Sequence, residues 1–149
     1  MVLDVVRRFE MVNSRLRLGP GLANITVAGL VDRHSSAAVI GACGRDLAPV
    51  RAHGLVADYS GARMMVCADE LMASASLVTG AGDPLRIPTA LVVHPDDLAM
   101  WRRYCDLQAR AGVLRMPFVD VELAHRWAAE FAALWEAQAR FRERERSRR

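Results

Sequence analysis

The chain has 149 residues, 52% of them hydrophobic, which suits one compact domain that buries roughly two thirds of its unfolded surface. Its net charge of +3 arises in residues 140–149, where six Arg and two Glu give +4, so the rest of the chain sums to −1. A body with that charge lacks the basic surface that neutralises phosphates, and we expect no nucleic-acid partner.

The cysteines and the apolar runs of the sequence indicate the cellular compartment of the protein. Cys43, Cys67 and Cys105 are far apart, odd in number and without metal-ligand spacing, so they predict free thiols in a reducing environment. The beginning of the chain lacks the roughly 7–15 apolar residues of a signal peptide, and no run approaches the ~18 residues of a membrane span. We therefore expect a cytoplasmic protein without integral membrane contact.

The first part of the chain predicts two strands and a helix. Residues 5–18 mix apolar residues with Arg and Asn and predict an edge strand, which a turn at Gly19-Pro20-Gly21 ends. The run Ala23–Leu30 is rich in β-branched and apolar residues and predicts a second strand. Asp32 is placed to cap a helix over residues 35–43.

The middle of the chain alternates strands and helices. Residues 55–57 predict a short buried strand that ends at Asp58-Tyr59-Ser60-Gly61, and residues 69–78 predict a helix. A glycine-rich loop over residues 80–84 follows. The continuously apolar run of residues 88–93 then predicts a strand with helices on both faces of its sheet.

The last part predicts two helices around one strand. Asp96 is placed to cap a helix whose apolar positions recur at helical spacing until Gly112. Residues 116–119 predict the last strand, and Asp120 is placed to cap a final helix that runs toward Arg144. That helix carries one apolar stripe, formed by Leu123, Trp127, Phe131, Leu134 and Trp135.

This order predicts an α/β fold with a mostly parallel central sheet, and particular residues suggest a family. They are Asp58-Tyr59-Ser60-Gly61, the strand over residues 86–93, Tyr104, Gly112, and Phe118, Ala124 and Trp127 in the pattern F-x-x-x-x-x-A-x-x-W. On these residues the chain resembles the STAS family, best known for anti-sigma-factor antagonists, and more closely the uncharacterised bacterial SpoIIAA-like proteins. The resemblance implies a STAS-like domain over residues 1–130, and residues 131–149 form a C-terminal helix extension with an Arg-rich tail.

The chain departs from the antagonists at their regulatory serine. Antagonists of this kind carry Asp-Ser-Ser-Gly, which their partner kinase phosphorylates, where this chain has Val66, Cys67, Ala68 and Asp69. Neither central residue has a hydroxyl group, so we expect no phosphorylation switch at positions 67 and 68.

Polar residues follow several of the predicted strands. Ligands of open parallel sheets bind outside the carboxyl ends of the strands, and Asp58, Tyr59, Ser60 and His94 are the candidate ligand-binding residues there. Helix capping is the competing explanation for Asp96 and for Asp120. The other histidines have no partner at metal spacing, and no phosphate-loop or dinucleotide motif occurs, so we expect no metal and no cofactor.

The extension predicts an interface, because a domain of this size has no core left to bury Phe131, Leu134 and Trp135. A homodimer or a partner protein would cover them. We expect a non-enzymatic, cytoplasmic regulatory or interaction protein of STAS-like type that binds a small ligand or a partner. The alternative is a small enzyme that uses His94 with Asp58 or Asp96 in acid/base chemistry.

Overall fold

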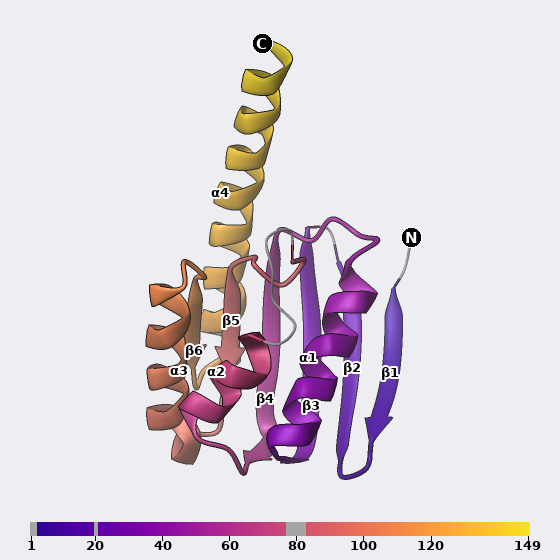
Figure 1. The fold of residues 1–149 in the computed structure, drawn as a ribbon, viewed down its shortest axis with the longest axis vertical. Helices are drawn as coiled ribbons and strands as arrows, with labels where there is room; N and C mark the ends of the chain where they lie inside the picture. Colours follow the sequence, from indigo (N-terminus) through magenta and orange to yellow (C-terminus); the bar gives the residue numbers. More distant parts are fainter. Residues whose placement is uncertain (1–2, 20, 77–82) are drawn as a thin grey trace.

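A six-stranded mixed sheet forms the centre of the protein, in a computed structural model that describes residues 3–19, 21–76 and 83–149 (Figure 1). The strands follow one another across the sheet in chain order. They are β1 (Asp4–Phe9), β2 (Val12–Leu18), β3 (Leu22–Val31), β4 (Gly54–Met64), β5 (Thr89–Val92) and β6 (Arg115–Phe118). The helices are α1 (Arg33–Leu47), α2 (Ala68–Ser76), α3 (Leu98–Arg110) and α4 (Val121–Ser147), with a short 3-10 turn, η1 (Pro95–Asp97).

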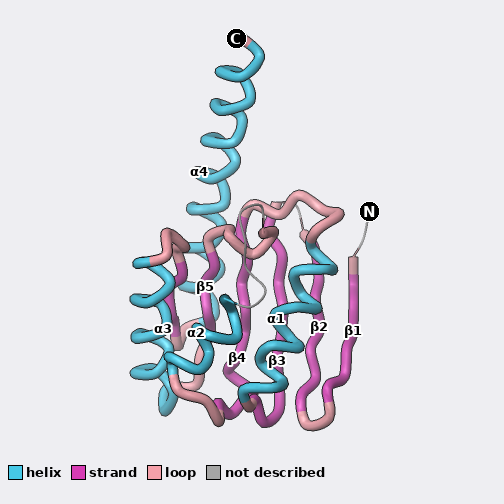
Figure 2. The backbone as a smooth tube through the Cα atoms, in the orientation of Figure 1, coloured by secondary structure: helices cyan, strands magenta, loops and turns pink. Residues whose placement is uncertain are grey.

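Strands β3 to β6 are mutually parallel, which confirms the parallel arrangement predicted for the strands near residues 55–58, 88–93 and 116–119. Three crossovers join them, and each steps in the same direction along the sheet. Because such crossovers are right-handed, they place α1, α2 and α3 on one face. Figure 2 shows these helices in front of the strands, with α4 behind the sheet. The mixed α/β architecture with helices on both faces is therefore as expected.

The antiparallel half of the sheet differs from the prediction. Residues 5–18 form two strands instead of one, joined by a tight turn in which Glu10 has a φ of 41°. The turn residues are Glu10 and Met11, and no Gly, Pro or Asn marks the turn, so the pattern looked like one strand. The predicted turn at Gly19 and Gly21 does connect β2 to β3, while Pro20 lies outside the described residues.

The main core lies between the sheet and α1, α2 and α3. It includes Trp101, Leu47 and Leu71, each at most 2% exposed. Asp32 caps α1 as predicted, since its carboxylate accepts a hydrogen bond from the Ser35 amide at 2.8 Å. The helix then continues to Leu47, past the predicted end at residue 43, because packing on the sheet stabilises the additional turn.

A second, thinner core lies between the sheet and α4. It consists of Val56, Ala90 and Val92 from the strands and Ala124 and Ala128 from the helix, all buried. Alanines therefore form most of the α4 surface that faces the sheet, with Trp127 packed beside them. Of the predicted apolar stripe, Leu123 and Leu134 are exposed and do not pack on the sheet, and Leu134 is one of the residues expected to lie at an interface.

Helix α4 continues well beyond the sheet at the end where the parallel strands begin (Figure 1). It has 27 residues and runs without interruption through the predicted domain boundary at residue 130. Asp120 caps it as predicted, accepting hydrogen bonds from the amides of Glu122 at 2.8 Å and Leu123 at 3.2 Å. In the described part of the chain, no helix is both long enough and apolar enough to cross a membrane.

Candidate functional site

The predicted ligand residues Asp58, Tyr59 and Ser60 lie within a strand and not at its end. Strand β4 continues to Met64, and its pairing with β3 moves from Asp58 opposite Thr26 to Gly61 opposite Ala28. One extra residue is thus accommodated in β4, which is a β-bulge. The bulge lies at the predicted site.

Strand alternation separates Tyr59 from its two neighbours. The Asp58 carboxylate accepts hydrogen bonds from the Ser60 amide at 2.9 Å and from the Ser60 hydroxyl at 2.6 Å, so these two side chains bind each other. Tyr59 packs instead with Leu55 and Ala57 in the main core and is only 9% exposed. The structure therefore keeps Asp58 and Ser60 together and places Tyr59 beneath the helices.

His94 caps a turn. Its Nδ1 accepts a hydrogen bond from the Asp96 amide at 3.1 Å, at the start of η1, and lies 3.6 Å from the Asp96 carboxylate. The expectation that Asp96 caps the helix is wrong. The Asp96 amide is itself capped by His94, and α3 begins only at Leu98. Within the described chain, no hydrogen bond or ion pair joins His94 to Asp58 or Ser60. Ligand binding by these three residues stays a prediction.

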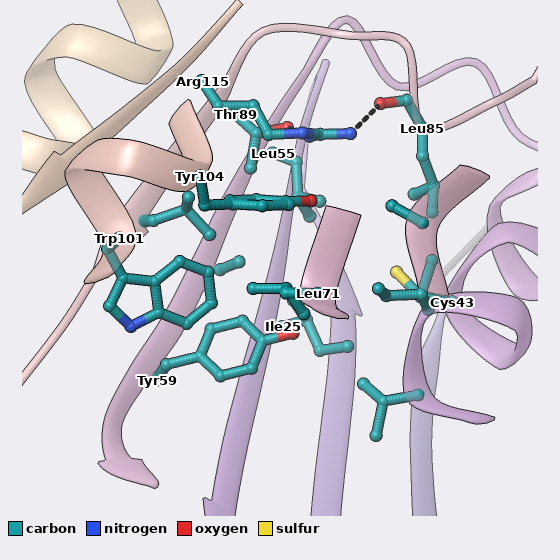
Figure 3. A pocket seen from close by; sticks show the side chains of 15 residues that line it. Ile25, Cys43, Leu55, Tyr59, Leu71, Leu85, Thr89, Trp101, Tyr104 and Arg115 are labelled. Carbon is teal, nitrogen blue, oxygen red and sulfur yellow. Dashed lines mark hydrogen bonds between the residues drawn. The ribbon is translucent and has the colours of Figure 1, made fainter. Parts of the chain in front are cut away.

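A cavity lies on the other side of the sheet, between the strands and α1, α2 and α3 (Figure 3). Its volume is about 50 Å³, and it is not sealed from solvent. Tyr59 points into it. Its other walls include Ile25, Val39, Cys43, Leu55, Leu71, Leu91, Trp101, Tyr104, Thr89 and Arg115. Most of this surface is apolar, and the polar groups are few.

Arg115 is the charged group of the cavity. It is the first residue of β6 and pairs in register with Thr89, the first residue of β5. Its Nη1 donates to the Thr89 hydroxyl at 2.7 Å, and its Nη2 donates to the Leu85 carbonyl at 3.0 Å, the bond drawn in Figure 3. Its Nε is buried and has no partner among the described residues. The guanidinium is thus held in place while its Nε–H remains unpaired.

Two tyrosines lie below the guanidinium. Their rings pack on the Trp101 indole, with centroid separations of 4.8 Å for Tyr59 and 5.6 Å for Tyr104. Burial raises the pKa of both phenols, so both remain protonated donors near neutral pH. The Tyr104 hydroxyl accepts a hydrogen bond from Gln108 Nε2 at 3.0 Å, which leaves its own proton free to donate.

Cys43 lines the same cavity but is a poor nucleophile. Burial raises the pKa of its thiol to about 12, so the reactive thiolate is scarce near neutral pH. In the parts of the chain that the structure describes, no three His, Cys, Asp or Glu side chains are grouped to hold a metal ion.

The sequence did not indicate Arg115, Tyr104 or Cys43 as site residues. Arg115 stands between Leu114 and Met116, where a single arginine looks like the flank of a strand. The sequence signal for Arg115 was an arginine immediately before a short apolar strand. Many strands have such a flanking arginine, so this signal does not distinguish a site residue. The rule that ligands gather at the carboxyl ends of strands pointed to the opposite end of the sheet, because Thr89 and Arg115 begin their strands.

The predicted interface residues lie along the outer part of α4. Phe131 is half-buried and stacks on Trp127 with a centroid separation of 4.6 Å, and Trp127 in turn lies 5.8 Å from Phe118 of β6. Leu134 is 58% exposed and Trp135 36%. The three predicted residues therefore remain accessible, next to an aromatic row that continues onto the edge of the sheet.

Together these features define a single α/β unit with a mixed sheet, a small cavity beneath three helices and a long projecting fourth helix. No protein-family model and no curated protein matches the chain. Among solved structures, the chain is similar to an anti-sigma factor antagonist from Mycobacterium paratuberculosis, with 15% sequence identity and a TM-score of 0.46. The match covers 87% of this chain and 95% of that one.

Proposed function

We propose that the protein is a non-enzymatic regulatory protein of STAS-like type that acts by association through α4, with a second copy of the chain as partner. The observation that carries this proposal is the apolar side of α4, which we call the α4 stripe. It consists of Leu123, Trp127, Phe131, Leu134 and Phe141, and so contains Phe141 where the stripe predicted from the sequence contains Trp135. Leu123, Leu134 and Phe141 are 47%, 58% and 65% exposed.

The α4 stripe is distinct from the side of the helix that packs on the sheet. Its members are four, four, three and seven residues apart, so they lie on one side of the helix. Ala124, Ala128 and Ala132 face the sheet instead and are buried. Leu123, Leu134 and Phe141 are thus largely exposed, although Trp127 packs beside the second core. An exposed apolar surface of this kind usually marks an interface.

The spacing of the stripe favours a second helix as the occupant. Trp127, Phe131, Leu134, Gln138 and Phe141 are separated by four, three, four and three residues, which is the seam spacing of a coiled coil. A second copy of α4 provides a matching seam. In a dimer with twofold symmetry, the same patch is used on both chains.

The charge of α4 favours an antiparallel pair. Residues 140–149 hold six Arg and two Glu, so parallel helices would place two strongly basic ends side by side. Antiparallel helices separate those ends, which reduces the repulsion between like charges. The helix also extends past the sheet, so the domains of the two chains need not collide (Figure 1).

Sedimentation tests this proposal. The wild-type chain is expected to be a dimer, and Leu134→Glu is expected to be a monomer because a charge at the seam loses its hydration on association. Ala133→Glu is the matched control, since Ala133 is exposed but lies off the α4 stripe, and it should remain dimeric. A wild-type chain that sediments as a monomer at high concentration, or a dimeric Leu134→Glu variant, would contradict the proposal.

A further inference from the structure

We propose that the cavity beneath α1, α2 and α3 is a binding site for a small monocarboxylate, with Arg115 as the residue that holds its charged group. This proposal is independent of association through α4. It rests on the donors of the cavity, on their charge and on the size and polarity of the walls.

The cavity has more hydrogen-bond donors than acceptors. Arg115 Nε is buried and unpaired. The Tyr59 hydroxyl lines the same cavity and can donate a hydrogen bond. The Tyr104 hydroxyl already accepts a bond from Gln108 and can donate its own proton. A buried donor without an acceptor costs free energy. A ligand that brings acceptors and no donors would satisfy all three groups.

The charge of the cavity points to an anion. No carboxylate lies within ion-pair distance of Arg115 among the described residues, and the guanidinium stays charged at every physiological pH. Thr89 and the Leu85 carbonyl are neutral partners that orient it without neutralising it. A carboxylate accepts hydrogen bonds from arginine more strongly than a neutral oxygen does.

The walls of the cavity determine the size and the polarity of the uncharged part of the ligand. Ile25, Val39, Leu71 and Leu91 present hydrocarbon to the cavity, with Trp101 at one side. The volume of about 50 Å³ holds only roughly three to five water-sized groups, by comparison with about 10–15 Å³ for each. These dimensions fit a short aliphatic carboxylate and exclude a long acyl chain or a nucleotide from the cavity itself.

Propionate is the probe for the test, with propan-1-ol as a neutral molecule of matched size. In the wild-type chain, propionate should shift the NMR signal of the Arg115 Nε proton and raise the melting temperature in a concentration-dependent way. Propan-1-ol should do neither. Arg115→Gln should weaken propionate binding ~10-fold or more, since a hydrogen bond to a charged group is lost, and Tyr59→Phe should weaken it ~3–10-fold.

Arg103→Gln is the matched control, because Arg103 is exposed on α3 and pairs with Asp69 away from the cavity. It should bind propionate as the wild type does. If Arg115→Gln fails to fold, the wild-type NMR signal and Tyr59→Phe still decide the question. An Arg115 Nε signal that propionate leaves unchanged, or that propan-1-ol shifts equally, would overturn the proposal and indicate a cavity filled by water alone.

Discussion

At the scale of single residues, Gly29 shows how one backbone conformation supports the sheet. It has a φ of +111°, which residues with a side chain rarely adopt, and a Cβ at this position would clash with the Met11 carbonyl oxygen. The same oxygen accepts a hydrogen bond from the Leu30 amide at 3.1 Å. Glycine thus allows β3 to lie close against the turn between β1 and β2.

Gly29→Ala is therefore expected to destabilise the protein by about 2–3 kcal/mol, because both backbone strain and a steric clash are introduced. Gly61→Ala provides the control. Its nearest contact would be the Ala28 Cβ at 3.6 Å, an ordinary van der Waals distance. Denaturant unfolding of both variants checks this, and equal stability losses would show that the Gly29 conformation is not the cause.

The three cysteines are expected to differ in reactivity. Burial raises the pKa of Cys43 and Cys105 to about 12, whereas Cys67 is exposed before α2. Alkylation of the native chain at pH 8 should modify Cys67 alone, because only accessible thiolates react quickly. Mass spectrometry of the digested protein would detect this pattern, and rapid native labelling of Cys43 would contradict it. All three should react in denaturant.

At the scale of secondary-structure elements, α4 is held to the sheet by small side chains. A Cβ at Gly54 would lie 2.9 Å from the Ala132 Cβ and 3.2 Å from the Ala128 carbonyl oxygen. The helix therefore packs unusually close to the start of β4. Close packing of this kind leaves no room for a longer side chain on either element.

Ala128→Leu should cost about 1–3 kcal/mol, because the added atoms force the helix and the sheet apart. Ala129→Leu is the control at the neighbouring position, which is exposed, and it should change the stability by less than about 0.5 kcal/mol. Thermal unfolding of the two variants gives the comparison. If neither substitution changed the stability, α4 would not pack on the sheet as described.

The edge strand β1 is tied to α1 by an ion pair. Arg7 donates to the Asp46 carboxylate from Nε at 2.9 Å and from Nη2 at 2.6 Å. These hydrogen bonds hold the pKa of Asp46 below its ordinary value of 3.8. Because the folded-state pKa is depressed, the stabilisation is present above pH 3.8 and is lost as the pH falls through the folded-state pKa.

Asp46→Asn should therefore remove part of the acid sensitivity of folding. The variant is expected to be less stable than the wild type near neutral pH, and the difference should narrow as the pH falls below about 4. Unfolding curves measured between pH 7 and pH 2.5 test this. A difference that stays constant over the range would show that the ion pair does not contribute.

At the scale of the whole molecule, the basic end of α4 contributes charge without contributing to the fold. Residues 140–149 are all exposed, and their one described contact with the body is the pair of Arg51 and Glu143 at 3.8 Å. An exposed pair at that distance adds little to stability. The part of α4 beyond the sheet is thus available for contacts with another molecule.

Deletion of residues 140–149 should change the net charge from +3 to −1, because the segment carries +4. The free energy of unfolding of the monomeric Leu134→Glu background should change by less than about 0.5 kcal/mol, as for other surface changes. Isoelectric focusing and denaturant unfolding measure the two effects. A large loss of stability would show that the segment packs on the domain.

The sequence by itself determined the alternation of strands and helices, because hydrophobic periodicity and capping residues act locally. Asp32 and Asp120 cap their helices as predicted, and the apolar run of β5 required cover on both faces of the sheet. The residue pattern also showed that the large side chains of the last helix exceed what the domain can bury. These are properties of short segments, which sequence patterns describe well.

Only the tertiary structure decided where the polar groups meet. Strand β4 continues through residues 58–60, so strand alternation turns Tyr59 away from Asp58 and Ser60, and this continuation depends on pairing with β3, a neighbour distant in sequence. The register of β5 and β6 placed Arg115 beside Thr89, although 26 positions separate them in the chain. Long-range pairing and packing determine such a cavity, and no local pattern encodes them.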